Sequence, residues 1–489
     1  FINLIGKEVT FSDLTEAALK AQSLYRKKGF ITTRVLIPKQ DFLSGEVEIA
    51  VIESYLEDIK VTGGTDGTRD YIRYMTSGVL KDNLKNKIFK FDDLERQLLL
   101  IKKNGLGKLT STLSRGSKVG TSLLTIAIDP EPLNVSAFSN TDLSENLGDY
   151  VLGLKGSYTT KTKKPLKIGA SAKYAFPVTD GLTSGVLFLE KPSAKKGLTL
   201  NSIFAYSTTK TKDLFPQTSG ESINKGTSEY LSLGISYPFI LKRNTELGFD
   251  IATTIQNSHQ DLYQDNVRSN NVSTDRIRAL RVGLNGRKSL KRSYNTARFL
   301  FSQGFEGWDD SLTGDQQKSN LNSKPNFSTY KLDLSRQQFL GNDGVILQFN
   351  ASGQIASTAL PTPEKFSFGG QYYGKGFANS HIFGDAGWSS SVQLSKNMYA
   401  LVGVSYTKID FHDHATDVPV SAPSFSVGAS RNLTSSLSGY VHAHLMPEKS
   451  KTASGVDYKI KNKGISLGLN YYFISFNNPV LWAIQKIVG

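Results

Sequence analysis

The sequence predicts an α+β region at the N-terminus followed by one large all-β region of antiparallel strands. Up to about residue 130, several segments carry apolar residues at the spacing of one helix face. From residue 133 onward, apolar and polar residues instead alternate with a period of two, which is typical of β-strands. No run of about 18 apolar residues occurs, so no transmembrane helix is predicted.

The N-terminal region begins with a predicted amphipathic helix over residues 11–25. Ser12 or Asp13 is the expected N-cap, and Gly29 follows the end of the helix. Strands are predicted at 31–37, 47–52 and 56–61, so we assign residues 1–62 to a first small α/β unit.

A second unit repeats this pattern over residues 63–131. Helices are predicted at 71–80 and 90–101, and strands at 108–113 and 122–128. Two prolines, Pro130 and Pro132, prevent either kind of element from continuing and so predict a domain boundary.

Specific residues of both units resemble the POTRA domains of two-partner secretion transporters. The first unit carries the motif residues Tyr25, Gly29, Pro38, Gln40, Asp41 and Glu53, and the second carries Leu94-Glu95-Arg96 with Leu98 and Leu99, followed by Gly105-x-Gly107. Taken singly, Gly29 is explained as a helix terminator and the leucines as the core face of a helix. The resemblance implies that Tyr25, Pro38, Gln40, Asp41, Glu53, Phe91, Leu94 and Leu98 take part in capturing a substrate.

Residues 132–476 are predicted to form a transmembrane β-barrel. Strands such as 150–158 and 166–176 place large apolar residues on one face and Gly, Ser or Lys on the other. A soluble sandwich also alternates, but strands of about nine to eleven residues, aromatic residues at strand ends and a wet polar face favour a barrel. Because lipid forbids open sheet edges, the sheet must close, and about 344 residues at roughly 21 per strand give about sixteen strands.

The polar stretches between these strands predict the loops of the barrel. Longer stretches at 207–227, 256–274, 308–326 and 411–423 are the expected outer loops. The tail at 477–489 is either a short amphipathic segment or a flexible end.

One glycine-rich loop stands out within the barrel, near residues 361–387. Its centre contains Gly369, Gly370, Gly374, Lys375, Gly376 and Phe377, and Asp385 follows. In the two-partner secretion family, and in the related barrel-assembly insertases, a long loop folds into the lumen and carries an Arg-Gly-aromatic tip, which Lys375-Gly376-Phe377 resembles. The resemblance therefore spans the whole chain.

Two departures from that family concern the partner of the loop tip. The arginine is replaced by Lys375, and the later strand that carries an aspartate in the family has no acid at 401–406. Lysine lacks the planar fork that pairs bidentately with a carboxylate. We expect Asp385 or backbone carbonyls to substitute as partners, or Lys375 to be solvated in the lumen.

The sequence shows no set of catalytic or cofactor-binding residues. There is no phosphate-binding glycine-rich loop before a helix and no nucleophile elbow. His412 and His414, like His442 and His444, alternate onto one strand face, but without cysteine and with few acids nearby they do not predict a metal site. We therefore predict no enzymatic activity, no cofactor and no metal.

The composition agrees with a protein of the bacterial envelope. The chain has no cysteine, which suits an oxidising compartment, although many proteins simply lack this residue. Its net charge of +15 is spread along the chain, which favours a cation-rich channel lining or anionic lipid contacts over nucleic acid.

The resemblance implies a transporter in the bacterial outer membrane, with its POTRA domains in the periplasm. Its expected partner is a large secreted exoprotein, such as an adhesin, a haemolysin or a contact-dependent toxin, and its expected surroundings are membrane lipid and lipopolysaccharide. We expect a monomer. A barrel-assembly insertase is the alternative, and a passive porin has no use for POTRA domains.

Overall fold

The computed structural model describes most of the chain. The described residues are 4–42, 45–84, 88–141, 147–176, 181–193, 196–212, 222–265, 267–306, 318–342, 344–368, 382–396, 400–410, 420–445 and 465–472. The glycine-rich loop centre at 369–381, the histidines at 412 and 414 and the tail at 477–489 lie outside them.

The first N-terminal unit contains one long helix and a short hairpin. Helix α1 spans Phe11–Lys27, and strand β1 (Arg34–Leu36) pairs antiparallel with β2 (Ala50–Ile52). The N-cap is Thr10, and Asp13 lies at the third helical position, where the two side chains form a reciprocal capping box. The predicted caps Ser12 and Asp13 are therefore wrong, because the carboxylate acts from inside the first turn.

The second unit packs two helices on a three-stranded sheet. Its elements are β3 (Tyr55–Gly63), α2 (Asp66–Leu84), α3 (Phe91–Lys103), β4 (Gly107–Arg115) and β5 (Thr121–Pro130), and the strand order is β3-β5-β4. Leu56, Ile59 and Val61 of β3 are buried in one core with residues of α2, α3 and β5.

Strand β3 corrects the predicted boundary between the units. The boundary at residue 62 assigned 56–61 to the first unit, whereas β3 pairs in parallel with β5 of the second. The strand itself was predicted correctly, but the sheet to which a strand belongs depends on distant partners, which its own sequence does not reveal.

The remaining strands form a closed barrel of sixteen, in which consecutive barrel strands are antiparallel neighbours. They are β6 (Leu133–Asn140), β7 (Tyr150–Thr159), β8 (Lys167–Phe176), β9 (Leu182–Pro192), β10 (Thr199–Lys212), β11 (Ser222–Lys242), β12 (Thr245–Gln264), β13 (Val267–Leu290), β14 (Ser293–Gly304), β15 (Ser328–Leu340), β16 (Val345–Ala356), β19 (Ala386–Lys396), β20 (Ala400–Asp410), β21 (Val420–Asn432), β22 (Leu437–Leu445) and β23 (Ile465–Tyr472). The predicted barrel and strand number are thus confirmed.

The barrel is apolar outside and polar inside. Leu152 and Leu154 of β7 are 55% and 52% exposed on the outer face, as are many large apolar residues of the other strands. The alternate positions carry mostly Ser, Asn, Gln, Gly and charged residues, so they line a polar lumen.

Strands β10 to β13 extend further than the sequence predicted. Residues 207–212, 222–227, 256–264 and 267–274 belong to these strands, so the loops predicted at 207–227 and 256–274 are largely wrong. Tyr263 still pairs with Arg268 at the tip of the β12–β13 hairpin. In these parts of the strands, backbone pairing continues although polar side chains lie on both faces of the sheet. The alternation of apolar and polar residues that predicts a strand is therefore absent from the sequence.

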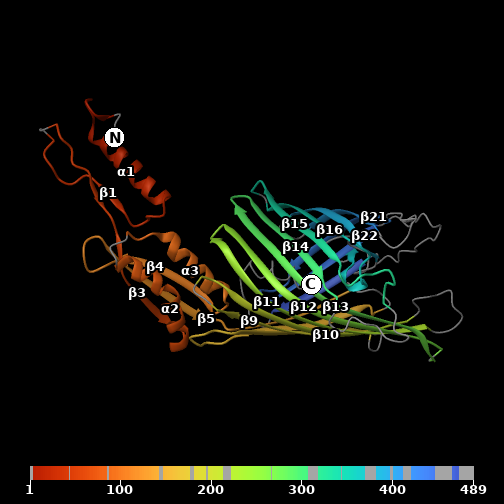
Figure 1. Ribbon diagram of the computed structural model, residues 1–489. Coiled ribbons are helices and arrows are strands. Elements are labelled where there is room, and N and C mark those ends of the chain that lie inside the picture. Colours follow the sequence, from red (N-terminus) through yellow and green to blue (C-terminus); the bar gives the residue numbers. More distant parts are fainter. Residues whose placement is uncertain are drawn as a thin grey trace.

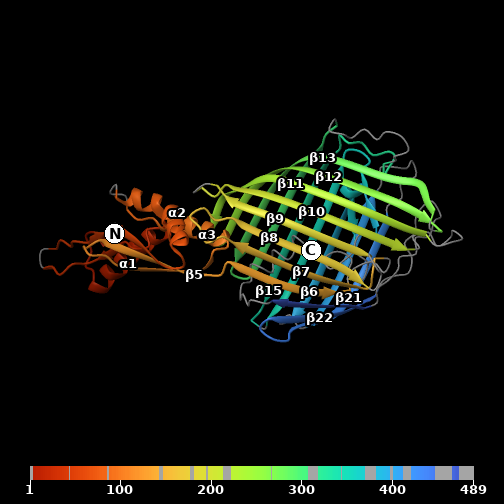
Figure 2. The ribbon, with the colours of Figure 1, turned by 90° about the horizontal axis from the view of Figure 1, so that it is seen from below.

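The N-terminal units lie at one end of the barrel (Figure 1). A second view shows that α3 lies next to the barrel and that the first unit is the most distant part (Figure 2). No described helix is long and apolar enough to cross a membrane.

Candidate functional site

The second N-terminal unit is joined to the barrel through α3. The guanidinium of Arg96 donates to the carbonyl oxygens of Lys196, at 2.9 Å, and of Pro238, at 2.6 Å. It also lies 5.9 Å from the ring centroid of Tyr237. One side chain of α3 therefore binds both the β9–β10 turn and the end of β11.

Apolar packing makes this joint continuous with the core of the second unit. Leu241 of β11 is only 5% exposed and belongs to the same buried cluster as Leu94 and Leu100. Gly197 in the β9–β10 turn has φ +99°, and a Cβ there would lie 2.6 Å from Leu100 Cδ2. Only glycine satisfies both the backbone conformation and this close approach.

Ion pairs surround the apolar part of the joint. Asp92 of α3 lies 3.4 Å from Lys242, and Lys103 pairs with Glu246 at the start of β12. Glu246 is also 3.1 Å from Arg287 of β13. Because water reaches all of these pairs, they contribute orientation more than binding energy.

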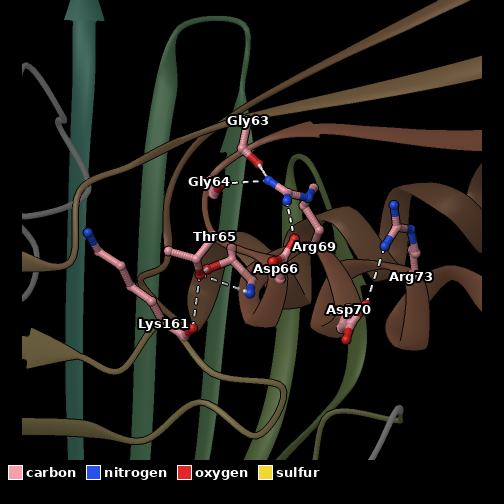
Figure 3. Close-up of polar contacts among 9 residues, drawn as sticks. Gly63, Gly64, Thr65, Asp66, Arg69, Asp70, Arg73 and Lys161 are labelled. Carbon is pink, nitrogen blue, oxygen red and sulfur yellow. Dashed lines mark hydrogen bonds and ion pairs between the residues drawn. The ribbon is translucent and has the colours of Figure 1, made fainter.

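The start of α2 makes a further contact with the barrel (Figure 3). Thr65 Oγ1 donates to the carbonyl oxygen of Lys161 in the β7–β8 turn at 3.0 Å. Arg69 donates to the carbonyl oxygens of Gly63 and Gly64 and pairs with Asp66, so it holds the turn between β3 and α2 in shape (Figure 3). Thus both helices of the second unit touch turns at the same end of the barrel.

A different polar site lies inside the barrel, where Arg281 of β13 meets Glu364. Arg281 is on the face opposite to Leu284, which is 51% exposed, so its side chain points into the lumen. Its Nη1 donates to Glu364 Oε2 at 3.1 Å and its Nη2 to Oε1, a bidentate pair. Ser302 and Thr254 accept further hydrogen bonds from the same guanidinium, at 3.0 Å and 3.2 Å.

Glu364 belongs to the first stem of the loop that the sequence singled out. It ends the short 3₁₀ helix η2 (Thr362–Glu364), and the next strand, β17 (Phe366–Phe368), pairs with β18 (Ile382–Gly384) of the second stem. The side chain of Gln354 donates to the backbone carbonyls of Glu364 and Asp385, at 2.9 Å and 3.2 Å. Strand β16 therefore holds both stems of the loop.

Asp385 is fully buried at the base of this loop. Its Oδ1 accepts a hydrogen bond from the backbone N–H of Leu360 at 2.7 Å and lies 3.9 Å from Nζ of Lys365. We call Arg281, Glu364, Gln354, Lys365 and Asp385 the lumen anchor. It connects the wall of the barrel to both stems of the loop.

A neighbouring loop supports the anchor from the side. Asn320 donates to the carbonyl oxygen of Leu360 at 3.2 Å, and Ser319 accepts from the backbone N–H of Thr362 at 3.1 Å. Phe327 and Leu360 are fully buried and pack on Ile277 and Ala279 of β13. The stem is thus fixed by apolar packing as well as by charge.

The predicted loop residues have different outcomes. Gly369, Gly370, Gly374, Lys375, Gly376 and Phe377 lie outside the described residues, so their roles and the partner of Lys375 stay predictions. Asp385 is buried at the base of the loop, and its role in holding the loop tip stays a prediction. The Arg281–Glu364 pair was missed, because its members are 83 positions apart and nothing in either local sequence links them.

Five of the predicted substrate-capture residues make contacts within the N-terminal units. Leu94 is 1% exposed in the core of the second unit, and Phe91 and Leu98 pack partly against that core. The side-chain amide of Gln40 accepts from the N–H of Glu48 at 2.6 Å and donates to its carbonyl at 2.8 Å, as a strand neighbour would. Tyr25 packs edge to face with Phe30, Pro38 and Glu53 are half-buried, and Asp41 is exposed.

Comparison with known proteins finds two matching family models. Residues 199–411 match the model of the haemolysin secretion/activation protein ShlB/FhaC/HecB, and residues 2–54 match the ShlB-type POTRA domain. Over these segments the chain matches the ShlB/FhaC/HecB family. It is a protein of the bacterial outer membrane whose POTRA units lie in the periplasm. The family that it matches consists of transporters.

The named relatives are distant in sequence. The chain is 24% identical over 374 residues to the heme/hemopexin transporter protein HuxB of Haemophilus influenzae, which covers 75% of this chain and 63% of that protein. It is 22% identical over 405 residues to the outer membrane transporter CdiB of Escherichia coli, covering 82% and 65%. The chain thus spans less than two thirds of the length of either relative.

Solved structures show the same fold. CdiB from Escherichia coli has a TM-score of 0.69 at 17% identity, covering 96% of this chain and 86% of that one. BamA from Haemophilus ducreyi, lacking POTRA domains 1–3, has a TM-score of 0.54 at 12% identity, with 96% and 95% covered. The ShlB-type match ends at residue 54, before β3, in agreement with the place of β3 in the second unit.

Proposed function

We propose that this protein captures an unfolded exoprotein with its POTRA units and passes it through the barrel to the cell surface. The observation that carries the proposal is the joint, where α3 fixes the second POTRA unit to turns at the periplasmic end of a barrel with a polar lumen. An exoprotein bound to that unit is held beside the entrance to the lumen. The match to the haemolysin secretion/activation family supports the proposal.

Strand β4 is the surface of the second unit that best suits an extended polypeptide. It pairs with β5 along one side, and among the described strands no other pairs with it. An unfolded chain adds to such an edge through backbone hydrogen bonds, without requiring one sequence. We propose β4 in place of the capture residues predicted on α3, because Leu94 is in the core and Arg96 binds the barrel.

The surroundings and partners follow from the same proposal. The partner is a large secreted adhesin, haemolysin or contact-dependent toxin, and the exposed apolar outer face suits membrane lipid and lipopolysaccharide. The protein acts as a monomer, because its barrel closes on itself and leaves no strand for a second copy.

Co-expression with the candidate exoprotein tests the proposal. Cells carry the full chain, or a version lacking residues 1–130, and the exoprotein is measured in the medium and on the cell surface. We expect export by the full chain alone. If the exoprotein stays in the periplasm with both versions while other barrels assemble poorly without this protein, the barrel-assembly insertase is the better hypothesis.

A further inference from the structure

Two lysines on adjacent strands project into the lumen side by side. Lys155 of β7 alternates with the outward-facing Leu152 and Leu154, and Lys173 of β8 is next to Tyr174, which is 42% exposed on the outer face. Both lysines are half-buried. Because Lys155 pairs with Ser171, Lys173 is its diagonal neighbour on the same face of the wall.

The residues around these lysines are small and carry hydroxyl groups. The cross-strand partners of Lys155 are Ser136 and Ser171, and those of Lys173 are Gly153 and Ser184. Short neighbours leave room over both ammonium groups. The three serines place hydroxyl donors beside them, as an anion requires.

An aromatic ring borders this part of the wall. A Cβ on Gly153 would lie 2.1 Å from Cζ of Phe138, so the absence of a side chain lets the ring lie flat against β7. The Nζ atom of Lys173 is 6.0 Å from the centre of that ring. The wall thus presents cations, hydroxyls and an apolar ring together.

Three other cations of the lumen wall already have acidic partners. Lys167 is 3.0 Å from Glu190, Arg298 is 3.3 Å from Asp250, and Arg281 pairs with Glu364. Within the described ranges, neither Lys155 nor Lys173 is within 4 Å of a carboxylate oxygen. Two neighbouring ammonium groups repel one another, and an anion between them removes that repulsion.

We propose that Lys155 and Lys173 form an anion-binding site that takes carboxylate side chains of a polypeptide in the lumen. The proposal rests on the proposed function, since the exported chain supplies the carboxylates. Phe138 suits the apolar parts of such a chain, whereas a free inorganic anion gains nothing from the ring. The site acts as a holding point for acidic segments during passage.

Lysine footprinting on the purified full-length protein tests the site without any export. The protein in detergent is labelled with an amine-reactive reagent, with and without hexaglutamate, and the rate at each lysine is followed by mass spectrometry. We expect hexaglutamate to slow labelling of Lys155 and Lys173 at least threefold. Lys331 of β15, an inward-facing lysine on another part of the wall, is the matched control and keeps its rate.

Three outcomes of that experiment separate the possibilities. Equal protection at Lys331 means that the lumen attracts acidic peptides diffusely, and unchanged rates at Lys155 and Lys173 mean that no site exists; either result overturns the proposal. Equal protection by inorganic phosphate at the same concentration identifies a small-anion site and overturns the assignment to polypeptide carboxylates.

A second measurement uses the variants Lys155→Gln and Lys173→Gln, with Lys331→Gln as control. Retained heat-modifiable migration on gels shows that each barrel is folded. We expect the double variant to bind fluorescent hexaglutamate at least tenfold more weakly and Lys331→Gln to bind it as the unmodified protein does. Because binding is measured on purified protein, a failure of export leaves this result interpretable, and equal binding by all variants contradicts the proposal.

Discussion

The joint with the second POTRA unit and the lumen anchor both depend on an arginine, but their environments differ. At the joint, the surrounding pairs use Lys103 and Lys242, which are 52% and 57% exposed. In the anchor, Arg281 and Glu364 are 17% and 6% exposed. Water screens the first set of charges and barely reaches the second.

This difference in burial determines what each contact can do. Exposed pairs contribute about 0–1 kcal/mol each, so the joint depends on Arg96, Leu100 and close packing at Gly197 more than on its ion pairs. A buried pair is costly to break, since one partner then remains charged without compensation. The anchor is therefore the contact that is costlier to break, and the joint is the more adjustable one.

The largest expected effect is that of Glu364→Gln. It keeps the shape of the side chain but leaves Arg281 without a counter-charge, at a cost of about 3–5 kcal/mol for the anchored stem. We expect faster hydrogen–deuterium exchange at residues 357–368 in the full-length protein. Asp261→Asn is the matched control, because Asp261 pairs at 2.6 Å with Arg268, which is 54% exposed on the β12–β13 hairpin.

A double-mutant cycle sharpens the same point. Arg281→Gln combined with Glu364→Gln removes both charges. We expect the increase in hydrogen–deuterium exchange of the double variant to be smaller than the sum of the increases in the two single variants. Strictly additive changes in exchange would show that Arg281 and Glu364 do not act as a pair.

The next largest effect is expected for Arg96→Ala at the joint. The variant loses two charge-assisted hydrogen bonds to carbonyl oxygens, each worth about 1.5–3 kcal/mol. Spin labels on α2 and on the β15–β16 turn should show a broader distance distribution between the second POTRA unit and the barrel. Arg73→Ala is the control, since Arg73 forms its ion pair with Asp70 of the same helix. Equal broadening in both variants would argue against the role of Arg96.

A smaller effect is expected for Asp92→Asn, which removes the exposed pair with Lys242. The variant is expected to lose less than about 1 kcal/mol of interaction free energy between the second POTRA unit and the barrel. This difference disappears at about 1 M salt, where the screening length falls to roughly 3 Å. The same distance measurement at low and high salt checks it. Broadening that is independent of salt would mean that Asp92 acts through packing.

The smallest effect concerns pH and Glu57 in the second POTRA unit. Hydrogen bonds from Thr121 and Ser117 lower the pKa of Glu57 below its ordinary value of 4.5. A lowered pKa in the folded state stabilises the fold above 4.5, and this contribution is lost as the pH falls through the folded value. We expect residues 116–121 to lose exchange protection there, and Glu57→Gln to remove that pH dependence; an unchanged profile in the variant would contradict this.

The sequence predicted what depends on local pattern. The helical spacing in α1 and α3 and the period of two in β7 and β8 placed these elements within a few residues. A strand with one apolar face must bury that face in lipid or a core, so the pattern also predicted the barrel and its approximate strand number. The resemblance of the POTRA motifs and the loop tip predicted the family.

Tertiary structure alone decided the contacts between distant residues. Nothing in the sequence of β3 shows that it pairs with β5, and nothing near Arg96 shows that its side chain binds the barrel. Arg281 and Glu364 meet because the sheet curves into a barrel and the loop stem returns to its wall. Local sequence determines which backbone conformation a segment prefers and on which face of a helix or strand each side chain lies. The tertiary fold determines which of these faces come into contact.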